Sequence, residues 1–191
     1  MSEEKKDVKA QDPQMNERLL KTRSIMLSGE INKESAEKII SQLLVLEADD
    51  SDKEIKIFIN SPGGDVDAGY AIYDMVRFSS PKVIMIGAGL VASAASLVLL
   101  AVPAERRVGL PNSTYLIHQP MSGMKGVATA IEIYSKQIDR LRAKLDKVIA
   151  DATNKSVEEV KKDTERDHWL FSDEAKEYGL ISRIVEKRSD L

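Results

Sequence analysis

A strand pattern followed by a helix pattern occurs twice between residues 54 and 100, and this alternation constrains the fold most. The run EIKIFIN has isoleucine at every second position, which is the period of a strand. SPGG ends this run, and DVDAGYAIYDMVRF predicts a helix with Asp65 and Asp67 in its first turn, where negative charge suits the helix dipole. KVIMIGAG predicts the next strand and residues 89–100 the next helix. This order is typical of an α/β fold around a largely buried parallel sheet.

Further signals flank this segment. Asn32 is a plausible N-cap for a helix with an apolar stripe, and STYLIHQP predicts another strand, ended by a proline. Ser156 and Glu159 predict a capping box, Ser172 and Gly179 predict the two ends of a last helix, and LISRIV predicts a closing strand. Residues 1–17 are polar and lack any period. We therefore expect a mobile N-terminal segment over 1–17 and a single domain over 18–191.

The composition excludes several classes of function. The 191 residues are 42% hydrophobic, include no cysteine and carry a formal net charge of −3. The charge gives no general electrostatic reason to bind nucleic acid or an anionic membrane. Thiolate chemistry and zinc–thiolate sites are excluded, and the apolar runs are shorter than the ~20 residues of a membrane span. We expect a soluble intracellular protein without a metal.

The longest predicted helix covers about residues 127–153 and carries a narrow apolar seam. The seam residues alternate at spacings of three and four, as in a heptad pattern: Ile131, Tyr134, Ile138, Leu141, Leu145 and Val148. This helix either docks on its own domain or interleaves with a copy from another subunit. The pattern alone leaves both alternatives open.

Two serines lie in the apolar run GLVASAASLVLL. Ser93 comes where a strand and glycine segment turns into a helix, and amides at a helix start can hold an oxyanion. Ser96 lies one turn later, where its hydroxyl is expected to bond back to its own helix. Either serine is a spacer for close packing or a nucleophile, and Ser93 is the better candidate nucleophile.

A serine nucleophile needs a base and an orienting acid. Of the two histidines, His118 lies at a strand end, where sites in α/β sheets gather, and His168 lies beside a tryptophan. The acids at 163, 165 and 167 are all candidates, and their spacing does not choose among them. The glycines of SPGG offer a second loop of possible backbone donors.

From about residue 18 to its end, the chain resembles the Clp protease proteolytic subunit. The strings that carry the resemblance are INSPGGDVDAGYAIYDMV, LPNSTYLIHQP, IEIYSKQIDRLRAKLDKVIA and KKDTERDHWLFSDEAKEYGLI. The resemblance implies Ser93 as nucleophile, His118 as base and Asp167 as orienting acid, with the amides of Gly63 and Ala94 as oxyanion donors. It also implies the α/β superhelix shared with crotonases, from which the long helix protrudes as a handle.

The resemblance further implies an assembly of two face-to-face seven-membered rings. Unfolded proteins would be delivered by an AAA+ unfoldase, which uses ATP, so this chain needs no cofactor of its own. The handle seam, with Ile138, Leu141 and Leu145, would join the rings, and Arg166 would hold them in register. The cytoplasm is the expected location.

Two features depart from the family pattern. Ser93 is followed by Ala94 and Ala95 where the family has methionine and glycine, and the N-terminal segment is nearly all charged. Both features suggest a divergent paralogue that needs a partner ring. The alternatives are thus an active endopeptidase subunit, a weakly active or inactive subunit of mixed rings, and a crotonase-type acyl-CoA enzyme. The full set of triad residues argues against the last of these.

Overall fold

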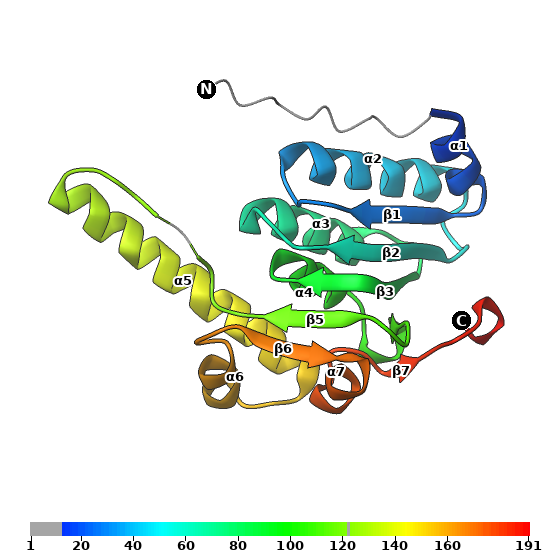
Figure 1. The fold of residues 1–191 in the computed structure, drawn as a ribbon. Coiled ribbons are helices and arrows are strands. Elements are labelled where there is room, and N and C mark those ends of the chain that lie inside the picture. Colours follow the sequence, from blue (N-terminus) through cyan, green and yellow to red (C-terminus); the bar gives the residue numbers. More distant parts are fainter. Residues whose placement is uncertain (1–12, 122) are drawn as a thin grey trace, which may run out of the picture.

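The computed structural model describes residues 13–121 and 123–191. Its central feature is a seven-stranded sheet with helices of very unequal length (Figure 1). The strands are β1 (Ser24–Ser28), β2 (Ile55–Ser61), β3 (Val83–Ala92), β4 (Arg107–Gly109), β5 (Thr114–Ile117), β6 (His168–Phe171) and β7 (Arg183–Ile184). The helices are α1 (Pro13–Lys21), α2 (Lys33–Asp49), α3 (Val66–Phe78), α4 (Ala94–Leu99), α5 (Ala128–Thr153), α6 (Val157–Asp163) and α7 (Ser172–Tyr178), with 3₁₀ turns at Ala104–Arg106 and Arg188–Asp190.

The sheet branches at β3. Strands β1, β2, β3, β4 and β7 form a parallel path, in which Met85–Gly87 of β3 pairs with β4. The second half of β3, from Leu90 to Ala92, pairs with β5 instead, and β6 runs antiparallel to β5. The expected parallel α/β sheet is therefore confirmed, and the branch sends β5 and β6 towards α5 (Figure 1).

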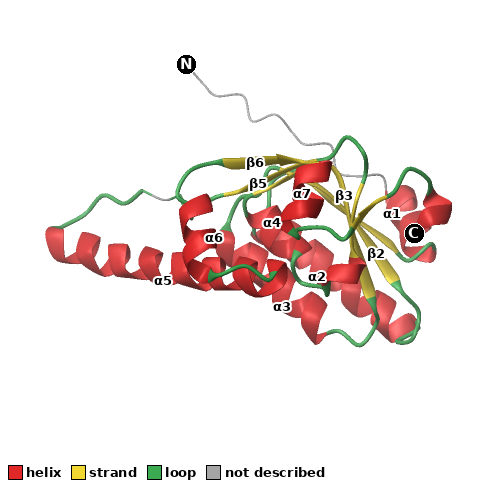
Figure 2. Ribbon diagram, turned by 90° about the horizontal axis from the view of Figure 1, so that it is seen from below, coloured by secondary structure: helices red, strands yellow, loops and turns green. Residues whose placement is uncertain are grey.

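The main core lies between the sheet and the helices α2, α3 and α4, which cover one face (Figure 2). The isoleucines at 55, 57 and 59 are fully buried there, as the alternation of EIKIFIN predicts. Lys56 and Phe58 between them are half-buried, and Phe58 packs with a small cluster on the other face that includes Ile84 and Val108. The Asn32 cap is confirmed, because its side chain accepts from Ser35 N at 2.9 Å.

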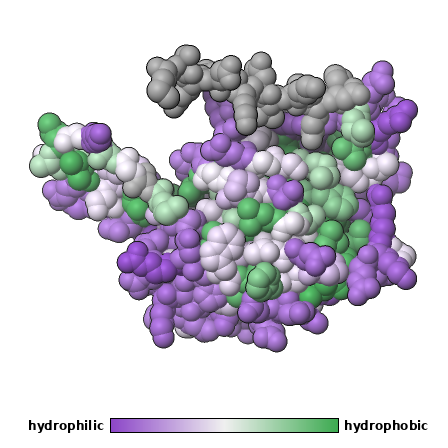
Figure 3. All heavy atoms as spheres, viewed as in Figure 1, coloured by the Kyte–Doolittle hydropathy of each residue, from purple (hydrophilic) through white to green (hydrophobic). Residues whose placement is uncertain are grey.

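The helix predicted over 127–153 is α5, and only its C-terminal part enters the core. Its buried residues are Leu145, Asp146, Ile149 and Ala150, while Ile131 is 45% exposed. The rest of α5 extends away from the body (Figure 1), and its free end carries apolar side chains (Figure 3). The docked alternative thus holds for the base of the helix, where Leu145, expected in the contact between rings, packs in the core of its own subunit. The seam residues Ile138 and Leu141 are half-buried, and Ile131 is exposed.

Several boundaries differ from the prediction. Helix α1 begins at Pro13, inside the segment expected to be mobile. Its helical turns are supported by the pair of Glu17 and Lys21 at 2.7 Å and by Leu20, which packs on the core. Residues 1–12 lie outside the described residues. Strand β3 continues to Ala92, so the helix over 89–100 shortens to α4.

Two helix caps also differ. Asp65 precedes α3 as its N-cap, where its carboxylate accepts from Ala68 N at 2.7 Å. Ser172 is the first residue of α7 rather than its cap, because its hydroxyl lies 2.8–2.9 Å from the carbonyls of residues 110, 111 and 113. The helix does end at Gly179. At the predicted capping box, Ser156 accepts from Glu159 N at 3.1 Å, but the reciprocal bond is not formed, and the Glu159 carboxylate pairs with Lys155 instead.

Candidate active site

Ser93 lies at the junction of β3 and α4. Its backbone adopts φ 57° and ψ −122°, an unusual conformation for a residue with a side chain. The amide of Ser93 donates to Leu116 O of β5 at 2.9 Å, which fixes the junction to the neighbouring strand. Helix α4 starts at the next residue, so the half-buried serine stands at a helix N-terminus.

His118 follows β5 directly and lies beside Ser93. Because β3 and β5 are parallel neighbours, their C-terminal ends meet at the same edge of the sheet. His118 is 8% exposed, and its Nε2 lies 2.8 Å from Ser93 Oγ. The pair has the geometry for a proton to pass from the serine hydroxyl to the imidazole.

Asp167 lies on the other side of His118. It immediately precedes β6, whose antiparallel register pairs His168 with Ile117, so Asp167 comes opposite His118. Asp167 Oδ1 is 3.2 Å from His118 Nδ1, and the Asp167 side chain is 58% exposed. A proton on Nδ1 directed at this carboxylate leaves the Nε2 lone pair facing Ser93, and we assign the tautomer on this basis.

The other acids of the segment have different surroundings. Asp163 Oδ2 accepts from Tyr178 Oη at 2.9 Å. Burial, and then this bond to Asp163, raise the pKa of Tyr178. Glu165 is exposed and contributes its backbone carbonyl to Gln119 Nε2 at 2.7 Å. The structure therefore brings Asp167, and neither of the two alternatives, to His118.

The second serine and the second histidine have structural contacts. Ser96 Oγ lies 3.0 Å from Val91 O and 2.9 Å from Leu116 O, and it is 2% exposed. Its hydroxyl thus ties α4 to β3 and β5, and the expected bond back to its own helix is wrong because α4 starts only at residue 94. His168 packs on Tyr178, with ring centroids 5.5 Å apart.

The two expected oxyanion donors differ in their surroundings. The amide of Ala94 is the first of α4, where a helix offers no acceptor of its own. The amide of Gly63 instead donates to Ser61 Oγ at 3.1 Å. Gly63 nevertheless packs directly on the site, since a Cβ added to it would lie 2.7 Å from Ser93 Cβ. The Gly63 amide, an expected oxyanion donor, is therefore engaged with Ser61 in this structure.

Two cavities adjoin the loop that follows His118. One, of about 600 Å³, is lined by His118, Gln119, Pro120, Met121, Glu165, Arg166 and Asp167. The other, of about 460 Å³, lies between the loop after β2 and the side of α5, with Pro120 and Met121 in common with the first. The first cavity reaches His118 and Asp167, and neither cavity is lined by Ser93 itself.

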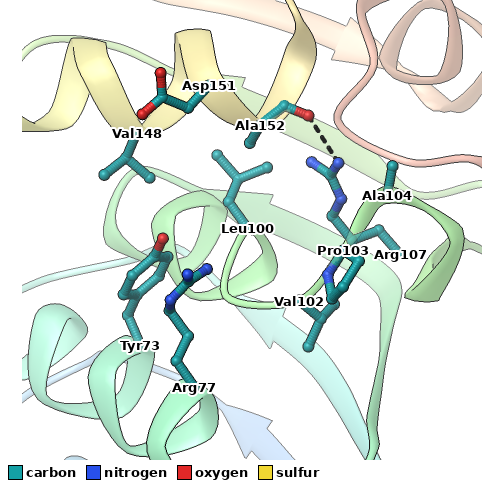
Figure 4. Close-up of a pocket in the computed structure, with 10 residues that line it drawn as sticks. All are labelled: Tyr73, Arg77, Leu100, Val102, Pro103, Ala104, Arg107, Val148, Asp151 and Ala152. Carbon is teal, nitrogen blue, oxygen red and sulfur yellow. Dashed lines mark hydrogen bonds between the residues drawn. The ribbon is translucent and has the colours of Figure 1, made fainter.

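A third cavity, of about 360 Å³, lies near the C-terminal end of α5 and contains no residue of the Ser93 site (Figure 4). Arg107 is 2% exposed there and donates from Nη2 to Ala152 O at 2.7 Å. Burial lowers the pKa of the Arg107 guanidinium. This arginine satisfies one of the last carbonyls of α5, so we assign it a role in closing that helix end.

No group of three or more potential metal ligands comes together within residues 13–121 and 123–191. Over the same residues, every helix is too short or too polar to cross a membrane.

Comparison with known proteins gives a consistent result. The Clp protease family profile matches residues 6–188. ATP-dependent Clp protease proteolytic subunit 2 of Treponema denticola is 54% identical over 190 residues, covering 100% of this chain and 95% of the relative. Subunit 3 of Rhizobium etli is 47% identical, with full coverage of both chains. Among solved structures, a ClpP1 point mutant from Listeria monocytogenes superposes with a TM-score of 0.85 at 44% identity, covering 92% of this chain and 98% of that one.

Proposed function

The chain belongs to the Clp protease family of serine peptidases, as a proteolytic subunit, and we propose that Ser93, His118 and Asp167 are its catalytic triad. The observation that carries this proposal is the continuous contact from Ser93 Oγ to His118 Nε2 at 2.8 Å and from His118 Nδ1 to Asp167 Oδ1 at 3.2 Å. The family match also favours this function over an acyl-CoA enzyme.

In the proposed reaction, His118 Nε2 takes the proton of Ser93 Oγ as that oxygen attacks the scissile carbonyl carbon. Asp167 holds the Nδ1 proton and stabilises the imidazolium that forms. His118 then gives the proton to the leaving amine, which releases the first product and leaves an ester on Ser93. A water molecule, deprotonated by His118, hydrolyses this ester and restores the serine.

Charge on the substrate oxygen would be stabilised by the Ala94 amide at the start of α4. The second donor implied by the resemblance, the Gly63 amide, first has to leave Ser61 Oγ. A substrate carbonyl that enters the site competes for this amide. The donor pair is therefore proposed to be complete only in the complex with substrate.

The proposed assembly is two stacked heptameric rings that receive unfolded proteins from an AAA+ unfoldase, which uses the ATP. The exposure of the seam residue Ile131, at 45%, and of Ile133 beside the seam, at 66%, supports contact between rings. Arg166 is exposed beside Asp167, where it is available to a second ring. The cytoplasm remains the proposed location, and we propose no cofactor for this chain itself.

A second candidate function is a ring subunit that is weakly active or inactive alone. The numbered names of the relatives, subunit 2 and subunit 3, favour a family with several paralogues per genome. Ala94 and Ala95 are 4% and 0% exposed, so both methyl groups are packed immediately behind Ser93. A second paralogue is thus a proposed partner.

The test compares Ser93→Ala with Ser96→Ala. We expect Ser93→Ala to lose roughly 10⁴-fold or more of peptide hydrolysis and all labelling by a serine-directed fluorophosphonate, without unfolding. Ser96→Ala should keep the label, because its hydroxyl only joins secondary-structure elements. Labelling of the wild type alone, compared with labelling in the presence of a paralogue, separates the two candidate functions. Labelling that survives Ser93→Ala and disappears in Ser96→Ala contradicts the assignment.

A further inference from the structure

A buried carboxylate of α5 is joined by one hydrogen bond to the segment that carries Asp167. Asp146 is 2% exposed, and its Oδ1 accepts from Thr164 Oγ1 at 2.8 Å. Thr164 is fully buried. The second carboxylate oxygen lies 3.9 Å from Nε of Arg142, one helical turn earlier. A buried carboxylate is costly unless it accepts hydrogen bonds. The bond from Thr164 Oγ1 to Asp146 therefore fixes α5 against the C-terminal end of α6.

The contact continues from Thr164 to the residue after His118. Thr164 O accepts from Gln119 N at 2.7 Å, and Gln119 Nε2 donates to Glu165 O at the same distance. Thr164 N also donates to Val160 O at 2.8 Å, which ends α6. The segments 118–119 and 164–165 are thus joined by two short hydrogen bonds, and Asp146 anchors one side of that junction.

Asp167 depends on its backbone for its position. Its side chain is 58% exposed and touches His118 through a single 3.2 Å contact, and exposed ion pairs hold their geometry weakly. Pairing between β5 and β6 ends at His168, so residues 165–167 are held by that strand on one side and by Thr164 on the other. If Thr164 shifts, the Asp167 backbone loses part of its support on that side, where the bond from Gln119 Nε2 to Glu165 O is the other attachment.

From this connection we infer that Asp146 is a positioning residue for catalysis, which acts through Thr164 to keep Asp167 opposite His118. This inference rests on the proposed function of Ser93, His118 and Asp167. Asp146 touches neither the substrate nor the reacting atoms. The base of the protruding helix is thereby part of the support of the active site.

The experiment removes each end of the Asp146–Thr164 bond and then restores it. Thr164→Val and Asp146→Ala should lower kcat by ~10-fold to ~100-fold, since a misplacement of about 1 Å costs ~10²-fold, while KM stays within about twofold. Thr164→Ser and Asp146→Asn keep a donor and an acceptor, so each should stay within about threefold of the wild type. The double variant should lose no more than the worse single variant, because both substitutions break one connection.

Two controls separate positioning from general stability. Ile149→Val lies on the same helix, is buried and lowers stability without touching the polar connection. Asp151→Ala removes an exposed acid that pairs with Lys147. Both should keep the kcat of the wild type at a temperature well below the melting temperature of every variant.

The outcomes distinguish this inference from the proposed function. Wild-type kcat in both Thr164→Val and Asp146→Ala overturns the inference, and so does a loss that Ile149→Val reproduces. Failure of Thr164→Ser and Asp146→Asn to rescue also overturns it. If the wild type neither hydrolyses peptide nor reacts at Ser93 with a fluorophosphonate, alone or with a paralogue, the proposed function fails, and the inference that depends on it fails too.

Discussion

Replacing Gly63 by alanine tests how closely the loop after β2 holds the nucleophile. Gly63 has φ +88°, a conformation that costs a residue with a side chain about 1–2 kcal/mol. Its added Cβ would lie 2.5 Å from Ala92 O, 2.7 Å from Ser93 Cβ and 2.8 Å from Ala94 N. Ordinary contact begins at 3.4 Å, so Ser93 and Gly63 have to separate by about 0.7 Å.

Gly29 provides the matched control. It has φ +79°, and nothing lies within 4 Å of an added Cβ. Gly29→Ala should therefore show the backbone cost of about 1–2 kcal/mol in denaturant unfolding and keep its activity. Gly63→Ala should add to this a loss of ~10-fold to ~100-fold in kcat/KM, because Ser93 no longer meets His118 at the present distance.

The assay is hydrolysis of a short fluorogenic peptide by the folded variants, with the rate of fluorophosphonate labelling of Ser93 measured in parallel. Labelling reports the reactivity of the serine independently of how the peptide binds. Equal unfolding energies for Gly63→Ala and Gly29→Ala, together with wild-type rates for both, would refute the reasoning. That result would mean that the loop moves aside and that its contact with Ser93 does not set the geometry.

Three further predictions concern assembly, pH and packing behind the nucleophile. Arg166→Ala should shift sedimentation towards single rings and lower activity, whereas an unchanged assembly with full activity removes Arg166 from the interface. Burial raises the pKa of Tyr115 from 10.0 to about 12. The unfolded chain therefore loses the phenol proton before the folded protein does, so the free energy of unfolding falls as pH rises from 10 through 12. Tyr115→Phe cannot ionise, so its free energy of unfolding should fall by up to ~3 kcal/mol less than that of the wild type over this pH range. Denaturant titrations in which both proteins lose the same free energy would contradict this. Ala95→Gly should raise peptide hydrolysis by the homomer if the packed Ala95 methyl group misplaces Ser93. Robust hydrolysis by the wild-type homomer, unchanged by Ala95→Gly or by an added paralogue, would show that this methyl group has no functional effect.

The predicted parallel sheet and the preference for Ser93 over Ser96 as candidate nucleophile followed from short-range patterns. The isoleucines at 55, 57 and 59 signal one buried face, and Ser93 stands where apolar strand residues pass into a helix. The choice of Asp167 did not follow from such patterns, because three acids lie within five positions and only the register of β5 and β6 separates them. Strand β6 itself was not predicted, since its burial alternates around Leu170 but the sequence has three apolar residues in a row, Trp169, Leu170 and Phe171.

Other features needed contacts between distant residues. The Gly63 amide turns to Ser61 Oγ, a competition that the SPGG motif does not reveal. Asp146 follows the seam residue Leu145 in an otherwise amphipathic helix, so its sequence position resembles that of an ordinary surface acid. Its burial becomes evident only when Thr164, eighteen residues later, is placed against it.

The free part of α5 has a thermodynamic consequence. No side chain over residues 128–144 is buried, and a helical segment of this length that buries so little is only marginally stable in water. The helix content of this segment should therefore depend on its binding to another subunit. It should rise with protein concentration, as the stability of a protein rises with the concentration of its ligand. In a dilute isolated subunit, amide hydrogens should exchange quickly along the free part and slowly from Leu145 onward. The boundary between these two regimes falls at Leu145, directly before Asp146, so gain or loss of helical order on assembly reaches the neighbour of the residue that anchors Thr164.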